Sequence, residues 1–213
     1  MTKGRIEFAV LILLALCAAL AAQVPASFDY YVLSLSWAPE FCAQPGAAGA
    51  NPKECAAGRR TGFVVHGLWP EAARGKSPES CGSVRPVARN VVNVALPYML
   101  SPSLIQHEWA THGTCSGLNP ADYFFAAIQA RSAVQIPVQM ISVEVPVRES
   151  PAQIEARFEG ANAAFPKGAF HVACRNGSLT EVRVCFTRDL KPAACPSRAG
   201  ECPEPAVNIR PVL

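Results

Sequence analysis

The stretch FDYYVLSLSW, residues 28–37, repeats its apolar pattern with a period of two residues. The positions that share one face are Tyr31, Leu33, Leu35 and Trp37. This period is typical of a half-buried β-strand. The next apolar run, TGFVVH at residues 61–66, predicts a second, more buried strand that ends at Gly67. The residues between the two strands, 43–60, are rich in Ala, Gly and Pro and are expected to form a loop.

Helices and one hairpin are predicted farther along the chain. The expected helices cover residues 87–99 (interrupted near Pro97), 102–112, 120–134 and 151–165. Asn119 and Ser150 each precede a proline and are the expected N-caps of the last two. Residues 170–186 contain Asn176-Gly177, a type I′ hairpin signature. Because strands and helices do not alternate strictly, we expect the α+β class, with a central, mostly antiparallel sheet and surrounding helices.

The composition limits the protein class. The chain has 213 residues, of which 50% are hydrophobic and 16% charged, with a formal net charge of +3. This apolar content excludes disorder, and the length favours one domain with a real core. The small charge excludes a polybasic nucleic-acid-binding coat, although a local basic groove is still compatible with it.

Residues 1–22 have the pattern of a secretory signal peptide. Lys3 and Arg5 precede 15 apolar residues, 8–22, which are fewer than the roughly 20 needed to span a membrane. We therefore predict an exported protein, periplasmic or extracellular, with a mature domain at residues 23–213 and no membrane segment in it. An uncleaved anchor is the alternative.

The cysteines indicate an oxidising compartment. The chain has nine, of which Cys17 lies in the predicted signal peptide. An even number behind such a segment predicts four disulfides in a single domain, with the pairing left open. The absence of any CxxC pair argues against zinc. The eight are Cys42, Cys55, Cys81, Cys115, Cys174, Cys185, Cys195 and Cys202.

Three of the four histidines lie in two short segments, FVVHGLWP (63–70) and HEWATHGTC (107–115). On a helix, Glu108 and His112 share one face. His107 and His112 are five residues apart and so subtend about 140°, unlike the histidines of a zinc-binding HExxH helix. We therefore expect no metal and no cofactor. His171, in the hairpin, is expected to be structural.

Two imidazoles and a carboxylate without a protein nucleophile suit a substrate that carries its own nucleophile. Histidine both accepts and donates a proton near neutral pH. In RNA the 2′-OH can attack the adjacent phosphorus once a base removes its proton, while an acid protonates the departing 5′-oxygen. DNA lacks the 2′-OH and cannot react in this way.

The two segments, together with SLSWAPEFC (34–42), resemble the signature motifs of the ribonuclease T2 family of secreted endoribonucleases. The resemblance implies that His66 is the general acid and His112 the general base. It also implies that His107 binds phosphate, and that Glu108 stabilises the phosphorane or orients an imidazole. Trp69 would stack on a base, with a purely core-filling role as the alternative. The implied disulfides are Cys42–Cys55, Cys81–Cys115, Cys174–Cys202 and Cys185–Cys195.

Three positions bear on substrate binding. Thr111 stands where many family members have Lys, so a hydroxyl replaces a cation at the phosphorane. Ile105 stands where an aromatic residue often precedes the second motif. Glu71 follows the first motif where some relatives use Asp to read a base. These departures predict broad base specificity.

The sequence thus predicts a monomeric endoribonuclease that has no obligate protein partner. It would cleave single-stranded RNA to 2′,3′-cyclic phosphates and then to 3′-phosphates without a metal. A catalytically silent RNA-binding or toxin-like protein on the same scaffold is the main alternative. A two-histidine phosphoesterase acting on preformed cyclic phosphates is the other, but it needs two HxT/S repeats and only 112–114 qualifies.

Overall fold

The computed structural model describes residues 27–196 and 200–212, so the predicted signal peptide at residues 1–22 lies outside the described residues. A six-stranded sheet has the order β2-β1-β5-β6-β3, and β4 pairs with β5. All strand pairs are antiparallel except the single parallel bridge between β5 and β6. The predicted α+β class is confirmed. The strands are β1 Tyr30–Trp37, β2 Phe63–Glu71, β3 Val147–Glu149, β4 Phe170–Arg175, β5 Ser178–Thr187 and β6 Val207–Ile209.

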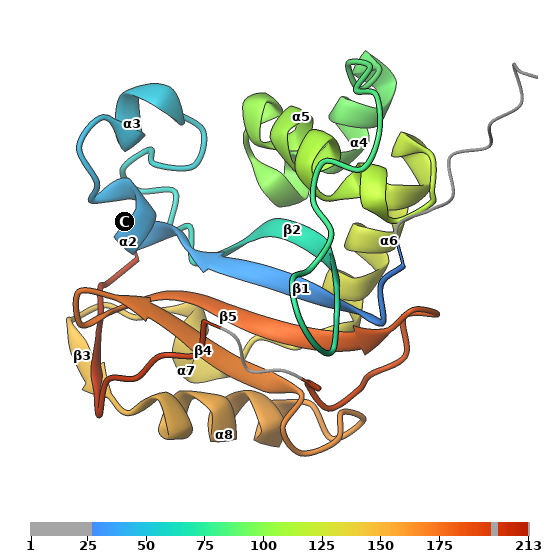
Figure 1. Cartoon of the computed structure of the whole chain (residues 1–213). Coiled ribbons are helices and arrows are strands. Elements are labelled where there is room, and N and C mark those ends of the chain that lie inside the picture. Colours follow the sequence, from blue (N-terminus) through green and yellow to red (C-terminus); the bar gives the residue numbers. More distant parts are fainter. Residues whose placement is uncertain (1–26, 197–199, 213) are drawn as a thin grey trace, which may run out of the picture.

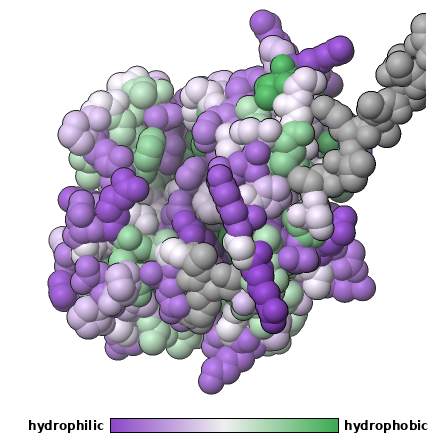
Figure 2. Space-filling view, viewed as in Figure 1, coloured by the Kyte–Doolittle hydropathy of each residue, from purple (hydrophilic) through white to green (hydrophobic). Residues whose placement is uncertain are grey.

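Helices flank the sheet beside β2 and beside β4 (Figure 1), and the buried residues of α6 and α8 join one core with the Tyr31 face of β1. Helices α4, α5 and α6 contact β2, whereas α8 packs against β4. No helix in the described ranges is both long and apolar enough to cross a membrane. Hydrophilic residues predominate on the face shown in Figure 2, with apolar ones scattered among them. The helices are α2 Ala38–Cys42, α3 Ala47–Ala50, α4 Arg89–Met99, α5 Pro102–Thr111, α6 Pro120–Ala133, α7 Val138–Ile141 and α8 Pro151–Ala161, with a 3₁₀ turn at Gly113–Cys115.

Strand β1 is more buried than its period predicts. The predicted face enters the main core, as expected. On the opposite face, however, Tyr30 and Val32 are also buried, because Trp69 and the Cys185–Cys195 bridge pack against them. The prediction of a half-buried strand was therefore wrong, since period two cannot reveal a second covering layer.

Strand β2 does not end at Gly67, as the sequence predicted, but continues to Glu71. Its pairing with β1 keeps the chain extended, since Ser34 pairs with Gly67 and Leu35 pairs with Val65. His66 is therefore the extra residue of a β-bulge. Bulges re-aim a side chain and are common beside active sites. The whole first motif thus lies on one strand, with its histidine at the irregularity.

Two further predictions needed correction. Helix α4 is not interrupted at Pro97 but runs to Met99, where Leu100 adopts a left-handed conformation (φ 59°). Pro97 lies in the last turn, so the ring disturbs little helix. The predicted loop 43–60 contains the short helix α3. The predicted hairpin is present as β4 and β5.

The predicted N-caps are present. The Asn119 side chain accepts a hydrogen bond from the backbone N–H of Asp122 at 3.0 Å. Ser150 and Gln153 form a reciprocal capping box at the start of α8. Each cap satisfies backbone donors that the helix itself leaves unpaired.

Four disulfides join cysteines that are 10 to 34 residues apart, and they are the four pairs that the resemblance implies: Cys42–Cys55, Cys81–Cys115, Cys174–Cys202 and Cys185–Cys195. The second joins the loop after β2 to the end of the second motif. It thereby ties the two histidine segments together, and each bridge contributes on the order of 2–4 kcal/mol to stability.

Candidate active site

Strand β2 and helix α5 bring the two histidine segments together. His66, Gly67 and Trp69 lie on β2, while His107 and Glu108 lie on α5 and His112 caps its C-terminus. Gly67 permits this close approach. A Cβ at that position would lie 2.0 Å from Oε2 of Glu108 and 2.5 Å from Nε1 of Trp69. Any larger residue would therefore push the helix or its carboxylate away.

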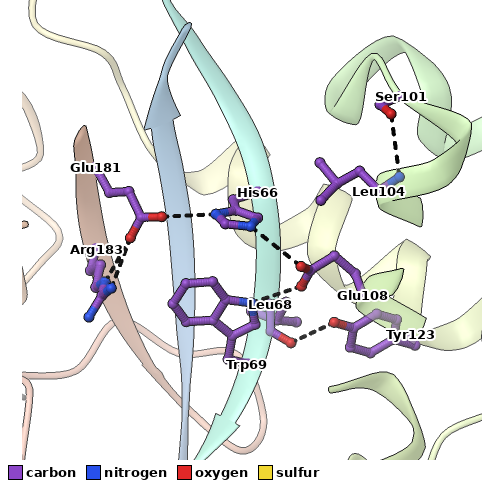
Figure 3. A network of polar contacts seen from close by, with 9 residues as sticks. All are labelled: His66, Leu68, Trp69, Ser101, Leu104, Glu108, Tyr123, Glu181 and Arg183. Carbon is purple, nitrogen blue, oxygen red and sulfur yellow. Dashed lines mark hydrogen bonds and ion pairs between the residues drawn. The ribbon is translucent and has the colours of Figure 1, made fainter. Parts of the chain in front are cut away.

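Two carboxylates flank the imidazole of His66 (Figure 3). Its Nδ1 lies 2.8 Å from Oε1 of Glu181 on β5, and its Nε2 lies 3.5 Å from Oε1 of Glu108. Burial alone would lower the pKa of His66, but the hydrogen bond with Glu181 and the charges of both carboxylates outweigh it and raise the pKa. His66 is thus favoured in its protonated form.

Glu181 is held ionised. Burial would raise its pKa, yet the hydrogen bond with His66 and the charge of Arg183 lower it to about 2. Nε of Arg183 donates to Oε2 of Glu181 at 3.0 Å, from the same side of β5. A fixed anion therefore accepts from Nδ1 of His66, which leaves Nε2 as the nitrogen that faces Glu108 and the site.

Glu108 is almost completely buried, with 1% of its side chain exposed. The indole Nε1–H of Trp69 donates to its Oε2 at 2.8 Å. Burial raises its pKa to about 7, although the charge of His66 and the bond from Trp69 act in the opposite direction. This carboxyl can therefore exchange a proton near neutral pH.

Trp69 connects the two ends of the site. Its ring centroid lies 5.3 Å from that of His66, edge-on, and 5.3 Å from that of His112, tilted by 31°. The guanidinium of Arg183 lies 5.2 Å from the same ring. These contacts, and its bond to Glu108, fix the indole between the two histidines.

His112 has the opposite electrostatic environment to His66. Burial lowers its pKa to about 4, and the charges of His107 and His66 act in the same direction. No carboxylate is among these influences. His112 is therefore neutral at physiological pH and able to accept a proton. His107 is exposed and lines a cavity together with His66.

The residues predicted to bind substrate are less central. Thr111 ends α5, and its carbonyl accepts from the backbone N–H of Ser80 at 2.7 Å. Glu71 ends β2, where the Ser77 hydroxyl donates to its carboxylate. Burial raises the pKa of Glu71 despite that bond and the charge of Arg183. Both residues lie at the ends of the elements that carry the histidines.

Glu181 and Arg183 were missed by sequence reasoning. They lie 115 and 117 positions beyond His66, in a strand whose sequence, SLTEVRVCF, reads simply as alternating. A signal was nevertheless present, because two charged residues at alternate positions of a central strand must share one face.

One group of potential metal ligands lies in the described part of the chain, formed by His171, Cys185 and Cys195. The two sulfurs are joined in a disulfide and so cannot act as thiolate ligands. His171 is buried beside them on β4, as expected of a structural histidine.

Comparison with known proteins identifies the family. The Ribonuclease T2 family model matches residues 28–195. The chain belongs to this family. It is 41% identical to a ribonuclease of Aeromonas hydrophila over 112 residues, 52% of this chain and 48% of that protein. It is 26% identical over 190 residues to ribonuclease DdI of Dictyostelium discoideum, and this match covers 83% of this chain and 82% of that protein.

Solved ribonuclease T2-like structures share the fold. Trichomaglin, described as an S-like ribonuclease, superposes with a TM-score of 0.69 at 23% identity over 88% of this chain and all of that one. The chain spans about half the length of the Aeromonas protein and of a probable ribonuclease of Haemophilus influenzae.

The opposite environments of the two histidines predict separate titrations. In an NMR titration of the imidazole resonances, His112 should titrate at about 4 and His66 above its usual 6.5. The variant Glu181→Gln removes the anion bonded to Nδ1 and should lower the pKa of His66. The variant Glu79→Gln, which removes an exposed carboxylate elsewhere, should leave it unchanged. A His66 pKa that is insensitive to Glu181 would contradict this electrostatic account.

Proposed function

We propose that this protein is an endoribonuclease that cleaves single-stranded RNA by acid–base transphosphorylation without a metal. The opposite pKa shifts of His66 and His112, on either side of Trp69, carry this proposal. Where the surroundings shift the pKa values of two titratable groups in opposite directions, the group with the raised pKa serves as the acid and the group with the lowered pKa as the base. Family membership and ribonuclease-named relatives support the same activity.

His112 is the general base and His66 the general acid of the first step. Neutral His112 removes the proton of the 2′-OH, and the 2′-oxygen attacks the adjacent phosphorus. The bond from phosphorus to the 5′-oxygen then breaks, and protonated His66 delivers its proton from Nε2 to that oxygen. The products are a 2′,3′-cyclic phosphate and a free 5′-OH. Each positioned acid or base contributes about 10²–10⁴ in rate.

The second step reverses these roles. His66, now neutral, removes a proton from water, whose oxygen attacks the cyclic phosphate. His112, now protonated, returns its proton to the departing 2′-oxygen, which leaves a 3′-phosphate. The same two groups therefore complete the cycle and return to their starting protonation states.

The surrounding residues position these two histidines. Glu108 orients the imidazole of His66 and, when protonated, can donate to a phosphorane oxygen. His107, exposed beside the site, binds the phosphate, while Thr111 contributes only a hydroxyl. The contacts of Trp69 favour a supporting role over base stacking. We assign Glu71 to the binding of a base, as the sequence predicts.

Export is part of the proposal. Four disulfides and the pattern of residues 1–22 fit a periplasmic or extracellular enzyme. We further propose that it acts as a monomer with RNA as its only required partner.

The central experiment compares two matched oligonucleotides in excess EDTA, one of RNA and one carrying 2′-deoxyribose throughout. The proposal predicts that only the RNA is cut and that its ends are first 2′,3′-cyclic phosphates, because the attacking group is the 2′-OH. A single ribose in the DNA strand should restore one cut, directly after it. Intact RNA would favour the catalytically silent scaffold, and cleavage of DNA would contradict the mechanism.

A substrate with an activated leaving group separates acid from base. In His66→Phe and His112→Phe, cleavage of RNA should fall at least about a hundredfold. On a uridine 3′-(4-nitrophenyl phosphate), whose leaving group needs no protonation, His66→Phe should recover most of its loss and His112→Phe should not. Thermal unfolding of both variants serves as the folding control. Equal recovery of the two variants would refute the assignment.

A further inference from the structure

Beside His66 lies a cavity of about 340 Å³ whose remaining lining residues have no role in the proposed proton transfers. It is bounded by β2, by the N-terminal part of α5 and by the segment between α2 and β2. Its apolar walls are Phe41, Val64 and Leu104, and its rim carries His66 and His107. Such a volume with a few convergent polar groups is typical of a small-molecule site. Figure 3 shows Leu104 facing His66 across this space.

Among the polar residues that line this cavity, which include Ser36, Asn51, Ser101 and Ser103, Glu54 is the one carboxylic acid. Only 5% of the residue is exposed, and its side chain lines the cavity. Within residues 27–196 and 200–212, that carboxyl has no hydrogen-bond or ion-pair partner. Buried carboxylates are normally paired, so an unpaired one that faces a cavity is aimed at something that enters it.

The position of Glu54 is fixed by its surroundings. The backbone N–H groups of Glu54 and Cys55 both donate to the carbonyl of Asn51, at 3.1 and 3.0 Å. The Cys42–Cys55 disulfide ties this turn to the end of α2. Burial raises the pKa of Glu54 to about 7, against the charge of His66. Donors brought by a ligand would therefore stabilise the ionised form.

The proposed chemistry identifies which part of RNA reaches this cavity. His66, as the general acid, contacts the departing 5′-oxygen, and His107 contacts the phosphate. The nucleoside attached to that oxygen is therefore the one next to the cavity that both histidines line. A flat base fits between apolar walls, and single-stranded RNA presents its base edges for such recognition.

We propose that Glu54 reads a guanine as the base of the leaving nucleoside, an inference that rests on the proposed function. Guanine presents N1–H and N2–H side by side, and these match the two oxygens of an ionised carboxylate. Adenine and cytosine present one donor beside a bare ring nitrogen, and uracil presents one donor between two carbonyls. This preference departs from the broad specificity that the sequence predicts.

The test uses the dinucleoside monophosphates CpG, CpA, CpU and CpC, with kcat/KM measured for the purified protein. The wild type should cleave CpG at least about tenfold faster than CpU or CpA, the range expected of one bidentate contact. GpC should gain no such advantage over CpC, because its guanine lies on the other side of the cleaved bond. Glu54→Gln should abolish the preference and leave CpU cleavage within about threefold of the wild type. Glu204→Gln, which removes the same charge from an exposed position, should keep the preference for CpG.

The failures of the two proposals are distinguishable. Equal cleavage of all four substrates by the wild type would overturn the role of Glu54 while leaving the nuclease intact. A preference for the base on the 5′ side of the cleaved bond would also overturn the role of Glu54. So would an equal loss of CpG and CpU cleavage in Glu54→Gln, since the residue would then serve the fold. Absence of cleavage of any RNA would overturn the proposed function, and this inference with it.

Discussion

The β-bulge at His66 is the constraint on which the site depends. It places the imidazole between two carboxyl groups, that of Glu181 on strand β5 at one nitrogen and that of Glu108 on helix α5 at the other. The approach of α5 is possible only because Gly67, the next residue, has no side chain. The Cys81–Cys115 bridge then fixes the end of that helix to the loop that follows β2. The backbone thus determines the distances before any substrate arrives.

These distances create two histidines of opposite character within one small volume. His66 has a carboxyl group at each ring nitrogen, whereas His112 is partly buried and has only other imidazoles as charged neighbours. Trp69 holds the two rings apart and at a fixed angle. An acid and a base that coexist at one pH need this kind of separation, since identical environments would leave both histidines in the same protonation state.

Features set by local sequence were predictable, and features set by long-range pairing were not. The Asn119 and Ser150 caps and the Asn176-Gly177 hairpin follow from a few neighbouring residues. The histidine motifs were found because their residues are contiguous. The bulge, the continuation of β2 past Gly67 and the arrival of Glu181 depend on strand register, which no local pattern encodes. Glu54 likewise looks like an ordinary surface residue until the fold buries it.

The pH dependence of kcat/KM for RNA cleavage in excess EDTA tests the assignment of His66 as acid and His112 as base, because it reports the ionisations of the free enzyme. The rate should rise with pH as His112 loses its proton, at about 4, and should fall above 6.5 as His66 loses the proton it must donate. The expected profile is therefore a bell with a broad, mildly acidic maximum. A profile without an alkaline limb, or one whose acid limb lies at 6.5 or above, would contradict it.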